Sequence, residues 1–328
     1  LPHPDGTEID PEHWWIALEG VGAAAPPNAE ALSIAAQQHT TIVLDERGEV
    51  VRRALLWNDL RAGECARDLR AELGDDVWLN GPALLPDSAH PVSKLRWIAR
   101  HEPATAERIA AVMLPHDWLT WRLLGEGRPA AIGGTTDRAD ASATGYWSPG
   151  TEAYRMDLVE HALGREATLP RVLEPGEWAG VTRTGLAVAA GCGDNAATHL
   201  ALDTRAGDMV ISIGTSATIS MRTDAPVSDP AGRIDTMADA RSGFIPIVTL
   251  LNGARVLTAT AGMLGVGLDH LDRLARDAPP DARGVVFVPH LDGDRDLPAA
   301  SSSGGFLGLS RHSMTPAVIA RAALLGIG

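Results

Sequence analysis

The sequence predicts an α/β fold built in two halves. Short strand patterns alternate with helix patterns, and a pair of strand patterns opens each half of the chain, at 41–57 and at 209–221. The length of 328 residues agrees, because chains of this size commonly fold as two domains. We therefore expect one domain over residues 1–200 and a second domain over residues 201–328.

The first half opens with a helix pattern that begins at His13, followed by an apolar run at 31–36 that is typical of a buried strand. Two β-branched runs, 41–44 and 50–57, flank the turn residues 45–48. Two strands that are joined by a tight turn predict a β-hairpin.

Helix patterns dominate the rest of the first half. We expect helices at 62–73, 91–101, 103–111, 115–124 and 151–163. Gly74 and Gly125 stand just beyond two of these patterns, where glycine commonly ends a helix. The stretch 127–150 is rich in Gly, Thr, Ser, Asp and Pro, so it predicts a loop with short strands.

The second half repeats the strand–turn–strand order at 209–221. Residues 247–272 then have a mostly helical pattern, and the apolar run 285–288 suits a buried strand. A final helix is expected from Pro316, because Thr315 can cap it and proline is well tolerated at the first helical position.

The net charge of −14 disfavours nucleic acid as a partner, since binding a phosphate backbone needs a positive field. A nucleotide pocket is still compatible with it, because such a pocket depends on local backbone N–H groups and a metal. Lys94 is the single lysine among 28 basic residues, which leaves little room for a lysine phosphate clamp.

The two cysteines, Cys65 and Cys192, lie far apart and lack the spacing of a zinc site. We therefore expect no disulfide framework and no zinc site, and the sequence points to no metal-ligating residue. No apolar stretch is long enough for a membrane span, and the first residues lack a signal pattern. These observations predict a cytoplasmic protein.

Asp194 is the first candidate for chemistry. It follows an apolar run and the sequence Gly191-Cys192-Gly193, at the point where a helix pattern begins. A carboxylate there can take a proton from a bound hydroxyl, and the glycines let the backbone approach a substrate. Aspartate is also a good helix N-cap, and spacing alone does not separate the two roles.

The turn Gly214-Thr215-Ser216 is the second candidate. Successive backbone N–H groups and two hydroxyls have the chemistry of a phosphate cradle. An ordinary hairpin turn has the same composition, so the pattern alone does not decide.

Gln38 and His39 follow the apolar run 31–36, at the end of the predicted strand. Ligands of α/β proteins usually bind beyond the carboxyl ends of strands, so these side chains could contact one. A single histidine can equally be structural, because one hydrogen bond satisfies it.

Eight motifs along the chain together resemble the FGGY family of carbohydrate kinases, and most closely its members that phosphorylate xylulose. Each motif is short, but all eight occur in the family's order. They lie at 37–39, 55–61, 93–97, 114–120, 136–145, 193–195, 214–216 and 288–295.

The resemblance implies two actin-like, ribonuclease-H-like domains, with the sugar and ATP bound in the cleft between them. It implies that Asp194 is the general base and that Gln38, His39 and Asn195 line the sugar pocket. It also implies that the turn 214–216 binds nucleotide phosphates, with Mg²⁺ as the accompanying ion.

The expected reaction is ATP-dependent phosphorylation of a ketose, D-xylulose to D-xylulose 5-phosphate. The alternatives are a kinase for ribulose, gluconate, glycerol or another polyol, and a catalytically inactive sugar-binding or regulatory homologue. The expected partners are the sugar and ATP, without a membrane, and a homodimer is one possible assembly.

The family also has an Asp-x-Gly-Thr strand, which would precede Leu1, and a glycine-rich adenosine motif, which would follow Gly328. A further departure is Asp294, where the family usually has glutamate. We therefore expect these residues to hold the acceptor side of the active site and only part of the ATP side.

Overall fold

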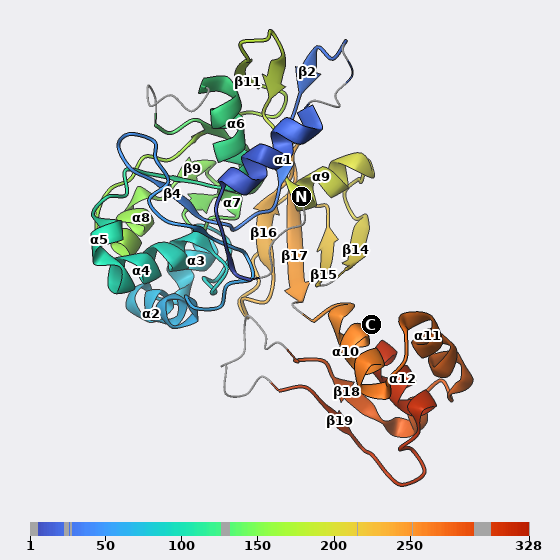
Figure 1. Ribbon diagram of the computed structural model, residues 1–328. Coiled ribbons are helices and arrows are strands. Elements are labelled where there is room, and N and C mark those ends of the chain that lie inside the picture. The colour runs from blue at the N-terminus through green and yellow to red at the C-terminus, as the bar shows by residue number, and fades with distance from the viewer. Residues whose placement is uncertain are drawn as a thin grey trace. The chain divides into compact units, whose positions relative to one another are not determined.

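The computed structural model describes residues 6–22, 26, 28–125, 132–214, 216–250, 252–291 and 303–327 (Figure 1). Thr215 and the motif residues 292–295, including Asp294, lie outside the described residues. The chain divides into two compact units, 1–209 with 221–247 and 210–220 with 248–328. The division of sugar and nucleotide binding at residue 200 stays a prediction.

The first unit contains short strands and nine helices within its described residues. The helices are α1 (Glu12–Gly22), α2 (Gly63–Leu73), α3 (Asp75–Asn80), α4 (Pro91–His101), α5 (Pro103–Ala106), α6 (Pro115–Gly125), α7 (Arg138–Ser142), α8 (Met156–Leu163) and α9 (Asp194–Ala201).

The strands of the first unit form several small sheets. In the order in which they pair, the strands are β1 (Glu8–Ile9) with β5 (Ala54–Leu55), β4 (Ile42–Leu44) with β6 (Ala111–Met113), β3 (Ala35–Ala36) with β13 (Cys192–Gly193), β7 (Thr135–Thr136) with β10 (Arg171–Val172), β8 (Trp147–Ser148) with β9 (Ala153–Tyr154), and β2 (Ala31–Leu32) with β12 (Ala187–Ala189), which also pairs with β11 (Trp178–Val181). β16 (Asp235–Ala238) pairs antiparallel with the start of β17 (Phe244–Leu250).

The strands β4 and β6 are buried on both faces, which explains their continuous apolar sequences. Because side chains alternate along a strand, Val43 and Val112 enter one core cluster, together with residues of α2, α4 and α8. Ile42 and Met113 enter a second cluster, which contains Trp118 of α6 (Figure 1). This unit therefore has helices packed on both sides of its central strands.

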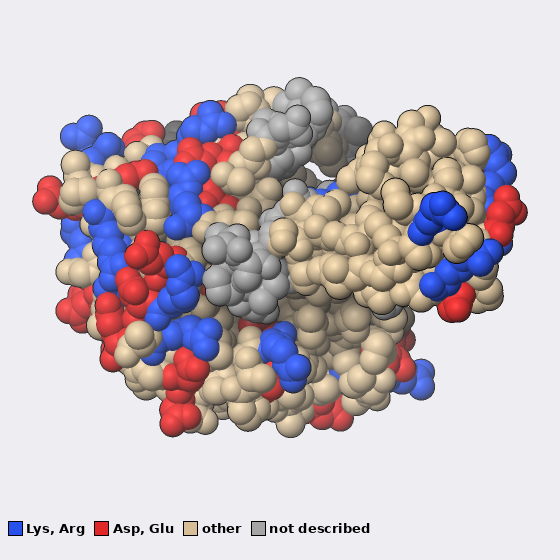
Figure 2. Space-filling view, turned by 90° about the horizontal axis from the view of Figure 1, so that it is seen from below, with Lys and Arg blue, Asp and Glu red and all other residues tan. Residues whose placement is uncertain are grey.

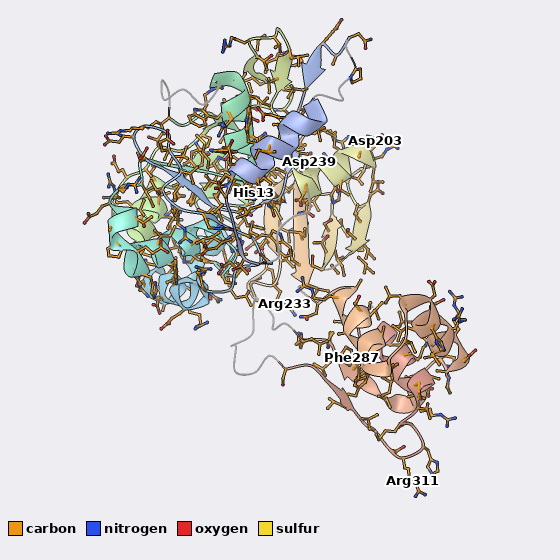
Figure 3. The ribbon with its side chains drawn as sticks, in the orientation of Figure 1. His13, Asp203, Arg233, Asp239, Phe287 and Arg311 are labelled. Carbon is orange, nitrogen blue, oxygen red and sulfur yellow. The ribbon has the colours of Figure 1, made fainter. Side chains whose placement is uncertain are left out.

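The second unit contains β14 (Met209–Ile213), β15 (Ala217–Met221) and the end of β17, followed by helical and strand segments. These segments are α10 (Arg255–Leu264), α11 (Leu268–Asp277), the 3₁₀ turn Ala282–Gly284, β18 (Val286–Val288), β19 (Gly305–Leu307) and α12 (Pro316–Leu325). Phe287 is buried in the core of this unit, with its ring 4.5 Å from that of Phe306 (Figure 3).

Several predicted elements are confirmed. The helices at 63–73, 91–101 and 115–125 and the strands at 209–213 and 217–221 lie where the sequence predicts them. The N-terminal cap of α12 is also as predicted, since the Thr315 side chain accepts a hydrogen bond from the backbone N–H of Val318.

Other predicted elements are wrong in extent or type. The helix predicted at 103–111 ends at Ala106, because the following residues enter the core and residues 111–113 pair with β4. The helix predicted at 151–163 begins only at Met156, after β9. The stretch predicted as helical at 247–272 is not one helix: β17 occupies it up to Leu250, and Gly265, in a left-handed conformation, ends α10 before α11 begins at Leu268.

The predicted hairpin is only partly present. β4 pairs with β6 and not with the segment 50–57, which forms a strand only at Ala54–Leu55. The two segments meet at isolated antiparallel bridges, which join Leu44 to Val50 and Thr41 to Leu55.

Acidic and basic side chains are interspersed over the left part of the face shown in Figure 2, and much of the remaining face carries other residues. Charged side chains of α4 and α2 form ion pairs, as Arg96 does with Glu72 at 2.7 Å and Arg100 with Asp68. Within the described residues, no helix has both the length and the apolar character that crossing a membrane requires.

Candidate active site

The short helix α7 is the scaffold for two of the predicted sugar-binding residues. Gln38 donates from Nε2 to the carbonyl oxygen of Ala139 at 3.1 Å, and His39 Nδ1 lies 2.8 Å from the carbonyl oxygen of Ala143. Asp137 starts the helix, because its carboxylate accepts hydrogen bonds from two backbone N–H groups of the first turn. The sequence predicted only loop and short strands here, so this helix is a correction.

His39 has an unusual backbone conformation for a residue other than glycine, with a φ of 61°. Lys94, which is fully buried, donates from Nζ to the carbonyl oxygen of His39 at 2.8 Å and to that of Leu55 at 3.3 Å. A charge-assisted hydrogen bond of this kind can hold a backbone that would otherwise relax. The single lysine of the chain therefore supports the segment that carries His39.

A second histidine, His90, packs edge-on against the ring of His39, with 5.0 Å between the ring centroids. Its Nδ1 lies 2.9 Å from Asp87 and its Nε2 lies 3.5 Å from Asp235. Burial alone would lower the pKa of His90, but the two carboxylates outweigh it and raise that pKa to about 9. These carboxylates favour the charged form of His90 next to His39, and they compete for Nδ1 with the backbone N–H of Asp87, which lies 3.0 Å from it.

Asp194 is the first residue of α9, and Gly193 occupies the N-cap position without a side-chain cap. Asp194 Oδ1 instead accepts hydrogen bonds from its neighbour Asn195, at 2.9 Å from the backbone N–H and 3.2 Å from Nδ2. Asn195 Nδ2 also lies 3.2 Å from Gln38 Oε1. Gln38, Asn195 and Asp194 thus form one connected polar chain.

The carboxylate of Asp194 is open to solvent, yet enough protein surrounds it that desolvation raises its pKa. The backbone N–H groups of Asn195 and of Asp194 itself oppose this shift. Among the described residues, none donates a hydrogen bond to the second oxygen, Oδ2. The arrangement leaves one carboxylate oxygen able to accept a proton from a ligand.

The glycines before Asp194 are needed for close packing against protein groups. Gly191 has a φ of +76°, and a Cβ there would lie 2.2 Å from Nε2 of His116. A Cβ on Gly193 would lie 2.5 Å from the side chain of Gln38. The sequence predicted that these glycines let the backbone approach a substrate, whereas the structure shows contacts with His116 and Gln38.

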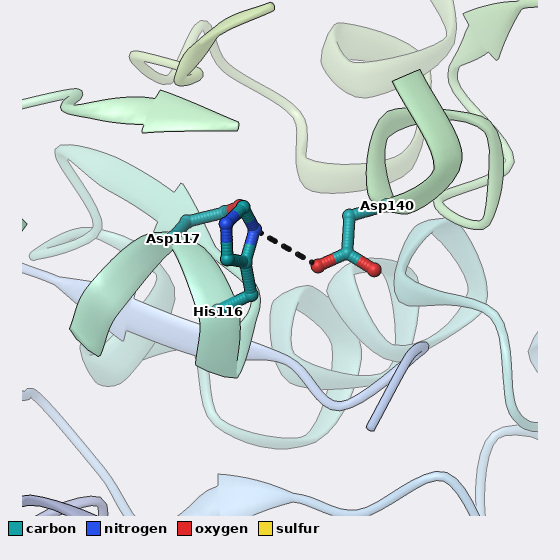
Figure 4. Close-up of side chains that lie close together, drawn as sticks. All are labelled: His116, Asp117 and Asp140. Carbon is teal, nitrogen blue, oxygen red and sulfur yellow. Dashed lines mark ion pairs between the residues drawn. The ribbon is translucent and has the colours of Figure 1, made fainter. Parts of the chain in front are cut away.

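A buried cluster of His116, Asp117 and Asp140 lies beside this segment, and no sequence motif predicted it as a site (Figure 4). The three residues each offer one metal-ligand type atom, and these atoms lie within 4.8 Å of one another. His116 and Asp117 stand in one motif, but Asp140 lies 23 positions beyond Asp117 and comes from α7. Only the fold brings them together, so no sequence spacing could have revealed the cluster.

The predicted phosphate turn belongs to the second unit. The backbone N–H of Gly214 donates to the carbonyl oxygen of Ser216 at 2.8 Å, and the N–H of Ala254 donates to the carbonyl oxygen of Gly214 at 2.7 Å. Gly214 is exposed and Ser216 is half-buried. The turn therefore packs against the start of α10 with its glycine open to solvent.

Comparison with known proteins gives consistent matches. The model of the N-terminal domain of the FGGY family of carbohydrate kinases matches residues 1–207. The chain is 41% identical over 334 residues to a xylulose kinase of Streptomyces coelicolor, an alignment that covers 98% of this chain and 66% of that protein. A xylulose kinase of Streptomyces rubiginosus gives the same identity and the same coverage.

A solved structure supports the same assignment. The crystal structure of xylulose kinase from Bifidobacterium adolescentis is similar with a TM-score of 0.84 at 31% identity, covering 100% of this chain and 74% of that one. The predicted α/β fold with two actin-like, ribonuclease-H-like domains is thereby confirmed. The chain spans about two thirds, 66%, of the length of the two Streptomyces relatives. The chain belongs to the FGGY family of carbohydrate kinases.

Proposed function

We propose that the protein phosphorylates a ketose with ATP, and that the ketose is D-xylulose, which becomes D-xylulose 5-phosphate. Two kinds of finding support this proposal. The relatives that match almost the whole chain are named xylulose kinases, and the first unit connects a solvent-open carboxylate to a set of polar side chains.

In this proposal the sugar binds to the first unit, within residues 1–200. Its hydroxyl groups are bound by Gln38, His39 and Asn195. Backbone carbonyl groups of α7 and its C-terminal end hold the side chains of Gln38 and His39 in place. His90 packs edge-on against the ring of His39 and is itself held by Asp87, so it restricts the position of the His39 ring.

The nucleotide binds to the second unit, within residues 201–328, at the turn Gly214-Thr215-Ser216. The exposed Gly214 and the hydroxyl of half-buried Ser216 fit a phosphate group, because both can face a ligand. Mg²⁺ would accompany ATP and neutralise the charge on its phosphate oxygens. A cytoplasmic location and a homodimer stay predictions.

Asp194 is the general base of the proposed reaction. It takes the proton of the sugar hydroxyl as that oxygen forms a bond to the γ-phosphorus, and the bond from the γ-phosphorus to the bridging oxygen of ADP breaks. The raised pKa of Asp194 makes it a better proton acceptor than an ordinary aspartate. The connected chain from Gln38 through Asn195 to Asp194 is the observation that carries this proposal.

A coupled ADP-release assay with a panel of D-xylulose, ribulose, gluconate and glycerol tests the proposal. The proposal expects sugar-dependent ADP release with the highest kcat/KM for D-xylulose. A higher kcat/KM for another acceptor would reassign the substrate. No turnover with any acceptor, together with saturable sugar binding, would instead support an inactive regulatory homologue.

A further inference from the structure

His116 connects helix α6 to the segment that leads into Asp194. Its imidazole is fully buried, and Nε2 lies 2.7 Å from the carbonyl oxygen of Ala190. A carbonyl oxygen can only accept a hydrogen bond, so Nε2 carries a hydrogen.

The other ring nitrogen faces two carboxylates. Nδ1 lies 3.3 Å from Oδ1 of Asp117 and 3.3 Å from Oδ2 of Asp140, and Figure 4 shows the carboxylate of Asp140 opposite the ring. All three side chains are buried. An ionised Asp117 or Asp140 favours a hydrogen on Nδ1 as well, which makes the ring an imidazolium.

The protonation preferences of the cluster agree with this geometry. Burial would lower the pKa of His116, but the carboxylates of Asp117 and Asp140 outweigh it and raise that pKa well above 6.5. Asp137, which caps α7, is the further acidic group that faces the cluster. Burial and the neighbouring Asp137 raise the pKa of Asp140 to about 8, and the positive charge of His116 opposes that rise.

A zinc ion is a poorer occupant of this cluster than a proton. The described residues provide three ligand atoms within 4.8 Å. Closed structural zinc sites use four protein ligands, and catalytic sites leave a position open to water or substrate. Three fully enclosed ligand atoms match neither arrangement.

The segment from Ala190 to Asp194 is held from two sides. His116 binds the carbonyl of Ala190, and the backbone N–H of Cys192 donates to the carbonyl of Ile34 at 3.1 Å. Gly191 fits between these contacts because it has no side chain, since a Cβ would lie 2.2 Å from Nε2 of His116 and 2.5 Å from the carbonyl oxygen of Ile34.

We propose that His116 is a positioning residue for Asp194: its imidazolium, fixed by Asp117 and Asp140, holds the Ala190 carbonyl and so sets the backbone from which Asp194 projects. This role rests on the proposed function of Asp194 as the base.

Helix α7 couples this support to the sugar-binding side. Asp140 of α7 faces His116, and one residue earlier the carbonyl of Ala139 accepts the hydrogen bond of Gln38. The same five-residue helix therefore positions the segment before Asp194 and one of the residues proposed to bind the sugar. Loss of the imidazolium should disturb the base more than the sugar pocket, because Gln38 keeps its own bond to α7.

The variant His116→Gln tests this role, with His161→Gln as the matched control. His161 is on the surface, where its Nε2 lies 2.7 Å from Glu72, so the control also removes a histidine–carboxylate contact. We expect kcat of His116→Gln to fall by about 10- to 100-fold, as small displacements of reacting groups do, with the sugar KM changed by less than about threefold. Hydrogen–deuterium exchange of the backbone amides at 191–194 should become faster in His116→Gln and stay unchanged in His161→Gln.

Retention of more than half of the wild-type kcat by His116→Gln would overturn the proposal. So would equal losses in kcat and in sugar affinity without faster exchange at 191–194, because these would indicate a general structural defect. If the wild-type protein turns over no sugar, the exchange result still tests the positioning of the segment, and only the proposed function fails.

A measurement on the wild-type protein requires no variant to fold. Nitrogen-15 spectra of histidine-labelled protein at pH 8 should show hydrogen on both ring nitrogens of His116. A neutral ring at this pH, or one equivalent of tightly bound metal by elemental analysis, would overturn the assignment of an imidazolium.

Discussion

Replacing Lys94 by methionine should test how the sugar-binding segment is held. Methionine has a similar length and fills the same buried space, but it cannot donate a hydrogen bond. The carbonyl oxygens of His39 and Leu55, now 2.8 and 3.3 Å from Nζ, would lose this donor. His39 would also lose a contact that holds its backbone at a φ of 61°.

The size of the effect follows from these contacts. A buried acceptor left without its partner costs about 1–3 kcal/mol. The Leu55 carbonyl still accepts from the backbone N–H of Thr41 at 3.0 Å, and the His39 carbonyl keeps a longer bond from the Thr41 hydroxyl at 3.4 Å, so the cost falls mainly on His39. Removing a buried ammonium group offsets part of this cost, because its desolvation was unfavourable. We therefore expect a loss of about 2 kcal/mol, which lowers the Tm of a unit of this size by about 4–8 °C.

The functional effect should be a raised KM for the sugar. A non-glycine residue in the left-handed region costs about 1–3 kcal/mol, so His39 should relax once Lys94 no longer binds its carbonyl. Its side chain would then lose its place beside Ala143, and we expect the sugar KM to rise about tenfold with a smaller change in kcat.

Thermal denaturation and steady-state kinetics of Lys94→Met measure both effects. The control is Arg171→Met, which removes an exposed contact of 2.8 Å to Glu177 and should change stability by less than about 0.5 kcal/mol. A Tm within 2 °C of the wild type, or an unchanged KM despite the expected destabilisation, would refute the reasoning.

Two further predictions concern the surroundings of the same site. The folded-state pKa of His90 is about 9, above its ordinary value of 6.5, so His90 adds stability that is complete below pH 6.5 and lost as the pH rises through 9. Denaturant midpoints at pH 6 and pH 9.5 should reveal a loss on the order of 3 kcal/mol, and parallel curves for wild type and His90→Gln would contradict it. Gly193→Ala should raise the sugar KM several-fold, because the new Cβ would lie 2.5 Å from Gln38, whereas the control Gly63→Ala makes only ordinary contacts at 3.8 Å. Equal KM values for these two glycine variants would exclude the predicted displacement of Gln38.

Long periodic segments were predictable because local sequence alone determines them. The helix at 91–101 begins with proline at its first position, and the strand patterns at 209–221 flank a glycine turn. Asp194 was correctly expected at the start of a helix. The structure adds that Gly193 is the N-cap and that the carboxylate binds Asn195.

The supports of the site were not predictable, because they depend on residues that are distant in the sequence. α7 has only five residues in a stretch rich in loop-forming types, so its pattern is too short to indicate a helix. Gln38 meets Ala139 across 101 positions, and His116 meets Ala190 across 74 positions. Such pairs follow from tertiary packing, so no short-range sequence pattern predicts them.

The central claim is that Asp194 is the general base, and the direct test is the kcat of Asp194→Asn with D-xylulose beside the affinity for that sugar. Asparagine keeps the size of the side chain and removes its basicity, and Asp203→Asn serves as the control because Asp203 is exposed. If Asp194 is the base, kcat of Asp194→Asn falls by about 10²–10⁴, while calorimetry shows sugar binding within a few-fold of wild type. Retention of more than a tenth of the wild-type kcat would contradict it.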